Sequence, residues 1–165
     1  MRLTNKRKAP LYNFIHTFLI MLFFGGICAY LFEKISYKKL GLEENLFIII
    51  PLSTLLIFYL RGRQIFEFDS DGEGLSIKNR HILPYFFAPI SDEFPKYKLI
   101  NYSIINTFII KRLYLNIKSK KSSGLTLKYE ISNLTKKEIA DLKRSLSKVI
   151  TNNKKDEENK SQEIE

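Results

Sequence analysis

The sequence is poor in the side chains on which most enzyme chemistry depends, with one cysteine and two histidines among 165 residues. A lone cysteine excludes a disulfide framework and a paired-cysteine metal site. A hydrolase needs a nucleophile beside a base or a cluster of metal ligands, and neither occurs at a recognisable spacing around His16 or His81. We therefore expect no catalytic residue, no cofactor and no metal, and we predict that the protein is not an enzyme.

Charge is absent from residues 14–32, which read FIHTFLIMLFFGGICAYLF. A helix needs about 20 apolar residues to cross a hydrocarbon layer of about 30 Å, so this segment is predicted to span a membrane. A secretory signal sequence also places basic residues before an apolar run. We favour a span because this run is longer, no small-residue cleavage site follows it, and a second apolar segment comes soon afterwards.

Residues 44–60 contain that second apolar segment, whose apolar run begins at residue 46 and is marginal in length for a span. The alternative is a helix buried in a soluble core. As a span it completes a transmembrane hairpin over residues 14–60, with an external loop at 33–43. Basic residues before and after the hairpin outweigh those of the loop, so the positive-inside rule places both termini in the cytoplasm.

Small residues interrupt the first span, where Gly25 and Ala29 lie four residues apart and Gly26 adds a second gap. Small side chains at this spacing let two membrane helices approach closely. We expect this face to pack against the second span, another copy of the chain or a larger complex. Residues 1–13 are predicted to be a basic, solvated cytoplasmic leader. The basic residues expected at the membrane surface are Arg7, Lys8, Arg61 and Arg63.

The net charge of +10 is concentrated outside the spans, and residues 61–150 carry 17 basic and 9 acidic side chains. A basic domain held beside an anionic leaflet gains about 1 kcal/mol for each basic residue close to the surface. Nucleic acid is the other common partner of basic proteins. The sequence shows no helix-turn-helix, aromatic RNA-binding stripe or zinc finger, so we expect membrane lipid rather than nucleic acid.

Residues 61–150 are predicted to form one small cytoplasmic domain rich in strands. Two runs of alternating apolar residues, 65–68 and 75–78, flank an Asp-Gly turn and are typical of a β-hairpin. The same alternation at residues 113–118 and 125–129 predicts a second hairpin. These two hairpins make the domain predominantly antiparallel.

The segment between the hairpins is less regular. Two prolines confine residues 80–90 to an edge strand or a bulged strand. We expect a loop at 91–97 and then two strands in residues 98–110, with a turn near Asn106. The aromatic residues of the first part belong to the core or, as the alternative, contact the membrane or a partner; they are Tyr85, Phe86 and Phe87.

A C-terminal amphipathic helix is predicted over residues 135–150. Thr135 and Glu138 form the Thr-x-x-Glu pattern of a capping box. Apolar residues recur at helical spacing along one face, which must be buried, and the predicted sheet is the obvious surface to cover it. Residues 151–165 are almost without apolar side chains and are predicted to be a disordered tail.

This order of two spans, short antiparallel strands and one amphipathic helix resembles small bacterial membrane proteins with a pleckstrin-homology-like (PH-like) domain. The resemblance rests on residues 66–77, FEFDSDGEGLSI, and residues 131–138, ISNLTKKE. It implies an α+β fold, with a two-helix transmembrane hairpin followed by an antiparallel PH-like β-barrel or sandwich capped by the C-terminal helix. It also implies the cytoplasmic (inner) membrane of a bacterium. These families share no catalytic residues, so the resemblance assigns no active site.

We accordingly expect a non-enzymatic, two-pass inner-membrane accessory or scaffold protein whose β domain docks a protein partner or a membrane complex. A homo-oligomer satisfies the same pattern. The alternative is a sensor of anionic lipid at the cytoplasmic leaflet. Besides the three aromatic residues, the candidate contacts to a partner or to lipid are Lys118, Lys120 and Lys121.

Overall fold

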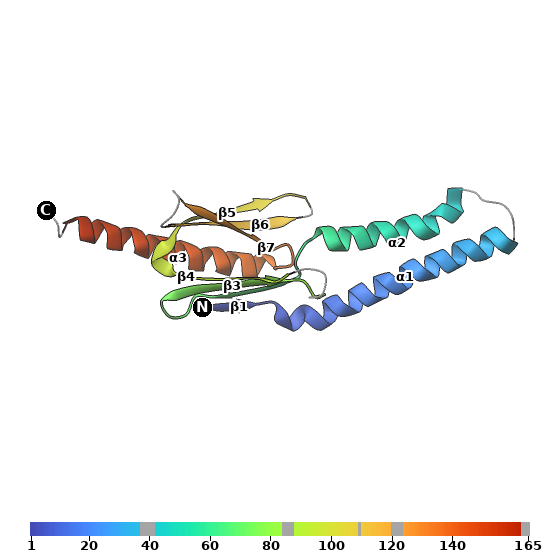
Figure 1. Cartoon of the computed structure of the whole chain (residues 1–165), viewed down its shortest axis with the longest axis horizontal. Helices are drawn as coiled ribbons and strands as arrows, with labels where there is room; N and C mark the ends of the chain where they lie inside the picture. Colours follow the sequence, from blue (N-terminus) through green and yellow to red (C-terminus); the bar gives the residue numbers. More distant parts are fainter. Residues whose placement is uncertain (37–41, 84–87, 109, 120–123, 163–165) are drawn as a thin grey trace.

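The computed structural model describes residues 1–36, 42–83, 88–108, 110–119 and 124–162. The chain is an elongated α+β protein with two long antiparallel helices at one end and two sheets at the other (Figure 1). The two helices are α1 (Ala9–Ser36) and α2 (Leu42–Leu60). Both ends of the described chain lie on the side of the sheets (Figure 1).

Four antiparallel strands form the first sheet in the order β1-β2-β3-β4. The first predicted hairpin is confirmed, because Phe68 pairs with Ile77 across a turn in which Gly72 has a φ of +67°. A positive φ costs glycine little, which explains the Asp-Gly sequence at this turn. The strands are β1 (Arg2–Thr4), β2 (Ile65–Asp69), β3 (Gly74–Arg80) and β4 (Ile90–Pro95).

Three antiparallel strands form the second sheet in the order β5-β6-β7. The second predicted hairpin is also confirmed, since Leu115 pairs with Leu127. The 3₁₀ turn η2 (Lys96–Lys98) joins the two sheets. The strands are β5 (Leu99–Asn106), β6 (Lys111–Ile117) and β7 (Leu125–Glu130).

Two predictions for the irregular segment are wrong. Residues 91–97 were expected to form a loop, but most of them belong to β4, in which Phe94 is buried and Asp92 accepts a hydrogen bond from the buried Tyr129. An acidic residue on the inner face disguised the alternation of this strand. Residues 98–110 were expected to give two strands with a turn near Asn106. The turn is confirmed, since β5 ends at Asn106 and the Thr107 N–H donates to the Ile110 carbonyl, but the segment gives one strand, which pairs with β6 with one irregularity after Leu99.

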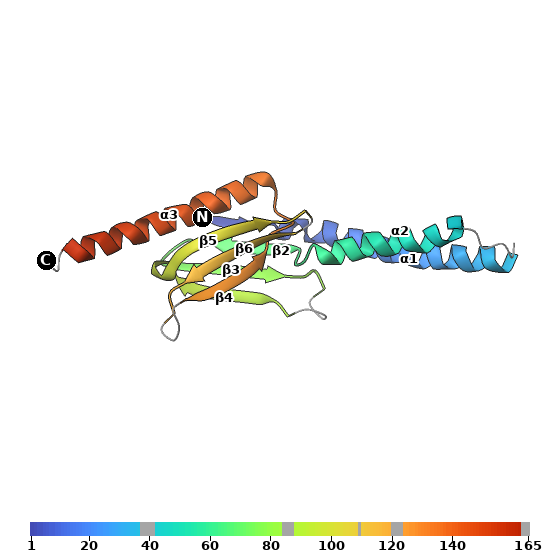
Figure 2. The same ribbon diagram turned by 90° about the horizontal axis from the view of Figure 1, so that it is seen from above.

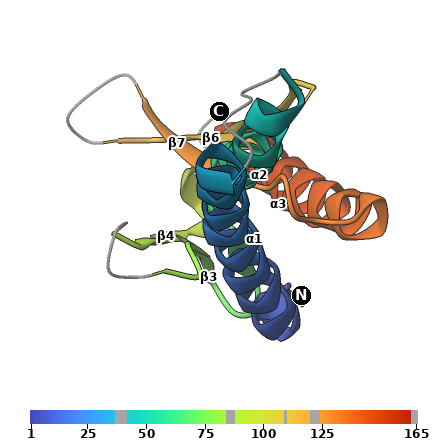
Figure 3. The same ribbon diagram turned by 90° about the vertical axis from the view of Figure 1, so that its right-hand side faces the viewer.

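The core lies between the two sheets and the helix α3 (Lys136–Gln162), which runs along one side of the stacked sheets (Figures 2 and 3). Leu142 and Leu146 of α3 are fully buried, which confirms the predicted apolar stripe. Within the described residues the sheets remain separate ladders and do not close into a barrel. The fully buried apolar side chains of the strands include Leu75, Ile77, Leu113, Leu115 and Tyr129.

The predicted solvated leader is different in the structure. Residues 2–4 form β1, and Leu3 pairs with Phe68 and is 7% exposed. Three residues with one apolar side chain carry too little alternation to indicate a strand, so only the exposed edge of β2 explains why this segment is ordered. The basic leader therefore begins as a strand of the sheet and not as a free tail.

The predicted disordered tail also differs, because α3 continues to Gln162 rather than stopping at residue 150. Asn153 fixes this extension, since its side-chain amide donates hydrogen bonds to the carbonyls of Lys96 and Leu99, at 2.8 and 2.9 Å. The Lys118 ammonium also pairs with Glu157 farther along the helix. These contacts are polar, so a prediction based on the scarcity of apolar residues could not detect them.

Candidate functional site

Helix α1 is the most conspicuous candidate for a functional element. In the described part of the chain, the segment Lys6–Ser36 is the one helix long and apolar enough to cross a membrane by length and composition, with a mean hydropathy of 2.0. Only 6% of its most apolar window is buried inside the protein. Helix α2 contributes a shorter apolar segment, Asn45–Leu60.

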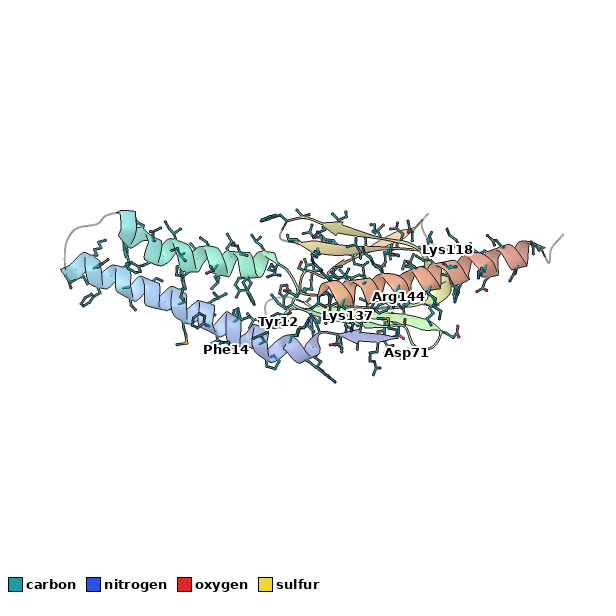
Figure 4. All side chains as sticks on the ribbon, turned by 180° about the vertical axis from the view of Figure 1, so that it is seen from behind. Tyr12, Phe14, Asp71, Lys118, Lys137 and Arg144 are labelled. Atoms are coloured by element: carbon teal, nitrogen blue, oxygen red, sulfur yellow. The ribbon has the colours of Figure 1, made fainter. Side chains whose placement is uncertain are left out.

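The outer surface of α1 and α2 is apolar and is not covered by the rest of the protein. Phe14 and Phe32, near opposite ends of α1, are both 68% exposed, whereas the phenylalanines of the first sheet are buried. The side chains stand out from both helices along their full described length (Figure 4). An exposed apolar surface of this extent marks a contact with membrane or protein. The other large exposed side chains include Phe18, Met21, Phe24, Ile49, Ile50 and Leu56.

The two helices approach most closely at Gly26. A Cβ atom at this position would overlap the carbonyl oxygen of Phe47, so only glycine permits the contact. Gly25 behaves differently, since a Cβ there would meet no atom within 4 Å. Gly25, Gly26 and Ala29 line an apolar groove of about 420 Å³ together with α2 residues around Phe47. The three predicted packing residues thus lie at the α1–α2 contact, but Gly26 alone requires the absence of a side chain.

A polar contact joins the same two helices near the sheets. His16 is 8% exposed, and its Nε2 lies 2.7 Å from the hydroxyl of Tyr59. The imidazole also packs against the rings of Phe58 and Tyr59. The structure thus places His16 between the helices, where it fixes their register.

Both helices are rooted in neighbouring strands of one sheet. β1 leads into α1, α2 leads into β2, and β1 and β2 pair with each other. Asn5 extends this pairing, because its side-chain oxygen accepts from the Phe66 N–H at 2.8 Å and its amide donates to the Gln64 carbonyl at 2.8 Å. Asn5 is 1% exposed, so these hydrogen bonds are dry. The helices therefore extend from the sheet as a continuous, fixed unit.

The end of α2 is held by a carboxylate from β7. Gly62 has a φ of +79° and its N–H donates to the Tyr59 carbonyl, which closes the helix. The Glu130 side chain lies directly over Gly62 and accepts a hydrogen bond of 2.6 Å from the Arg63 N–H. The guanidinium of Arg63 lies 3.5 Å from the same carboxylate. Arg63, predicted to face the membrane, is thus used within the protein.

The start of α1 is held by α3. Lys8 pairs with Glu138 at 3.1 Å, and the hydroxyl of Tyr12 donates to the Asn133 carbonyl at 3.4 Å. The predicted capping box is confirmed, since Glu138 accepts from the N–H and the hydroxyl of Thr135. Burial raises the pKa of Glu138, but these hydrogen bonds and the Lys8 ammonium outweigh it and lower the pKa overall.

We call the end of the β domain that adjoins α1 and α2 the helix-proximal end. Here β2 and β6 begin, β5 and β7 end, and α3 starts (Figures 1 and 2). Arg7 and Arg61 are exposed here, as predicted for the membrane surface. The first turn of α3 adds two exposed lysines, Lys136 and Lys137, that the sequence analysis did not single out. Figure 4 shows Lys137 beside the base of the helices.

The candidate contact Lys118 lies at the opposite end of the β domain, which is also the end that carries Asp71 (Figure 4). Lys118 forms an ion pair with Glu157, so its charge is engaged by another residue of the protein. The other candidate contacts lie outside the described residues, namely Lys120, Lys121, Tyr85, Phe86 and Phe87.

A cleft of about 770 Å³ separates α3 from η2 and the β2–β3 turn. Its lining carries both signs of charge, since it includes Glu73 and Asp156 as well as Lys96 and Arg144. Tyr97 at its rim is 66% exposed. The cleft lies on the part of the molecule directed away from α1 and α2, and it offers a surface for a protein chain rather than a closed pocket.

The described residues contain no group of three or more histidine, cysteine or acidic side chains that could hold a metal. His81 is mostly buried, and burial together with the positive charge of Arg63 lowers its pKa, so its imidazole is neutral near pH 7. No family model matches the chain, and neither a curated protein nor a solved structure matches it.

Proposed function

We propose that the protein is a non-enzymatic, two-pass protein of a bacterial cytoplasmic membrane, in which α1 and α2 span the bilayer and the β domain docks a protein partner at its surface. The observation that carries this proposal is the apolar surface exposed on both helices. The same residue types are buried in the sheets, so their exposure on the helices fits an apolar environment such as the interior of a bilayer.

Helix lengths support a two-pass arrangement. The 28 residues of α1 extend about 42 Å and the 19 residues of α2 about 28 Å at 1.5 Å per residue. A hydrocarbon layer of about 30 Å is exceeded by α1 and nearly matched by α2. Pro51 lies inside α2, and the carbonyl that loses its partner there can be compensated locally, as is common in membrane helices.

The rival interpretation of α1 as a cleaved signal sequence is disfavoured by what precedes it. Cleavage after α1 would remove β1 with its buried Leu3, and Asn5 with its hydrogen bonds to β2. It would also remove Lys8 from Glu138 and His16 from Tyr59. A folded domain that depends on residues before the apolar helix retains that helix.

Cysteine accessibility tests the membrane arrangement, because Cys28 is the single cysteine of the chain and is exposed on α1. We expect Cys28 to resist a membrane-impermeant maleimide in native vesicles until detergent is added. In a Cys28→Ala background, Ser36→Cys should react from one side of the membrane and Tyr97→Cys from the other. Reaction of Cys28 without detergent, or of both substituted cysteines from the same side, contradicts the proposal.

Site-specific photo-crosslinking tests the docking role. A photoreactive amino acid in place of Tyr97 at the rim of the cleft should crosslink to a distinct protein in native membranes. The matched control replaces Lys128, which is exposed on β7, and should give no such product. A monodisperse monomer in mild detergent, without crosslinks from Tyr97, argues against a docking protein.

A further inference from the structure

Among the described residues of the β domain, Phe108 is the most exposed large apolar side chain, at 103% relative exposure. It follows β5 in the turn to β6, where the Thr107 N–H donates to the Ile110 carbonyl at 2.8 Å. A short, closed turn does not require a phenylalanine at its tip. Ile105, just before it on β5, is also 52% exposed.

Hydrogen bonds place this turn at the level of the helix bases. Lys111, the first residue of β6, accepts at its carbonyl from the Ile131 N–H and donates from its own N–H to Ser132. The next residue along, Asn133, accepts the hydrogen bond from Tyr12 of α1. Phe108 lies beyond the last pair of the β5–β6 ladder, which joins Asn106 to Lys111. Figures 1 and 2 show the β5–β6 connection reaching the level where α2 meets the sheet.

The charge around this level is positive. Arg7, Arg61, Lys136 and Lys137 are exposed at the helix-proximal end, whereas the nearby acids Glu130 and Glu138 are engaged by Arg63 and Lys8. Lys136 and Lys137 occupy the first turn of α3, where the helix dipole disfavours positive charge. Their placement therefore serves something other than the stability of α3.

We propose that the helix-proximal end of the β domain is a second, peripheral membrane contact, in which Phe108 inserts at the boundary of headgroups and acyl chains while Lys136 and Lys137 bind anionic headgroups. An exposed apolar residue at the same end of a domain as exposed basic side chains is typical of interfacial binding, and anionic lipid attracts such charges. The inference rests on the proposed membrane span, because α1 brings this end to the bilayer. It assigns lipid contact to the end opposite Lys118.

Single-tryptophan variants test the insertion, because the chain contains no tryptophan. The full chain is placed in nanodiscs of phosphatidylcholine and phosphatidylglycerol, with and without phosphatidylcholine brominated on its acyl chains. We expect Phe108→Trp to show blue-shifted emission and several-fold more quenching by brominated lipid than Tyr97→Trp, the exposed control at the other end. Phe24→Trp reports the span itself, since Phe24 is exposed near the middle of α1.

These variants separate failure of the inference from failure of the span. If Phe24→Trp is quenched while Phe108→Trp matches Tyr97→Trp, the inference is wrong and the span stands. If Phe24→Trp is not quenched, the membrane span fails. Blue-shifted emission of Phe108→Trp without quenching indicates a protein contact and also overturns the inference.

The role of charge has its own matched pair. Replacing Lys136 and Lys137 by glutamine should weaken the increase in Phe108→Trp quenching that phosphatidylglycerol produces. Replacing Lys154 and Lys155, exposed farther along the same helix, should leave that increase unchanged. Equal effects of the two pairs, or none from the first, contradict the assignment of headgroup contacts.

Discussion

Lys8 and Glu138 are 130 positions apart, and the Lys8 Nζ lies 3.1 and 3.2 Å from the two carboxylate oxygens of Glu138. Glu138 also caps α3, because its carboxylate accepts hydrogen bonds from the N–H and the hydroxyl of Thr135, at 2.6 and 2.9 Å. One carboxylate therefore begins α3 and fixes the base of α1 against it. This contact couples the orientation of the proposed span to the fold of the β domain.

Replacing Glu138 by glutamine should destabilise the protein at neutral pH. The amide can still cap the helix but loses the ionic contact with Lys8, which is partly solvated and worth about 0.5 kcal/mol. The pKa of Glu138 is lowered by folding, so its contribution is complete above the ordinary value of 4.5 and is lost as pH falls through the folded-state pKa. Urea unfolding of the detergent-solubilised chain should be measured at neutral pH and again in acid, below the folded-state pKa. The difference in stability between wild type and variant should be smaller in acid.

Lys8→Met completes a double-mutant cycle with Glu138→Gln. We expect the two losses to be less than additive, because each substitution removes the same ion pair. Arg144→Met is the control, since Arg144 is exposed on α3 and its ion pair is with Asp141 rather than with Glu138. Strict additivity of Lys8→Met and Glu138→Gln would show that the contact contributes nothing.

Gly26→Ala and Gly25→Ala should differ sharply although the residues are adjacent. The methyl group at position 26 would overlap the Phe47 carbonyl of α2 and force the helices apart, at a cost of about 1–3 kcal/mol. The methyl group at position 25 meets nothing within 4 Å, and alanine favours a helix more than glycine does. Unfolding in mixed micelles with increasing sodium dodecyl sulfate, followed by circular dichroism, measures both. Equal effects would mean that α1 and α2 do not approach as described.

Patterns of local alternation were sufficient for much of this fold. The hairpins around Phe68 and Leu115, and the capping box at Thr135, follow from spacing that each segment displays by itself. Small-residue spacing also predicted a helix contact in this region, although the prediction rested on Gly25 and Ala29 and named Gly26 only as a second gap. In each case the residues that carry the signal lie close together in the chain.

What the sequence did not reveal depends on partners distant in the chain. β1 forms because β2 presents an open edge more than sixty residues later. The extension of α3 depends on Asn153 meeting carbonyls of η2 and β5, and Lys8 is recognisable as a structural residue only once Glu138 is beside it. Phe108 was one of the apolar residues of the strands expected in residues 98–110, so its exposure became apparent only in the fold.

Asn79→Ala should destabilise the β domain strongly. Asn79 of β3 is fully buried, and its amide donates to the Glu130 carbonyl at 2.9 Å and the Ile65 carbonyl at 3.2 Å. Its side-chain oxygen accepts from the Glu130 N–H at 3.1 Å, so this side chain joins the two sheets as a backbone strand would. Alanine leaves these backbone groups buried without partners, at a cost of about 2–4 kcal/mol.

Asn106→Ala is the matched control, because Asn106 is exposed at the end of β5. It should change the free energy of unfolding by less than about 0.5 kcal/mol, as is usual for surface positions. Urea unfolding of both variants, followed by tyrosine fluorescence, gives the comparison. A loss for Asn79→Ala no larger than that for Asn106→Ala would remove the bridge between the sheets from this account.

Tyr129→Phe should reduce stability at neutral pH and abolish a loss of stability at alkaline pH. The hydroxyl of the fully buried Tyr129 donates to the Asp92 carboxylate at 2.7 Å, which joins β7 to β4 and is worth about 1–2 kcal/mol. Burial, and then the hydrogen bond and negative charge of Asp92, raise the pKa of Tyr129 above its ordinary value of 10.0. Above that value the unfolded chain releases the phenolic proton while the folded protein retains it, so stability falls as pH rises. The free energies of unfolding of wild type and Tyr129→Phe should therefore differ at a pH below this value and converge at a pH above it. The free energy of unfolding of Tyr97→Phe, an exposed control, should follow that of wild type throughout.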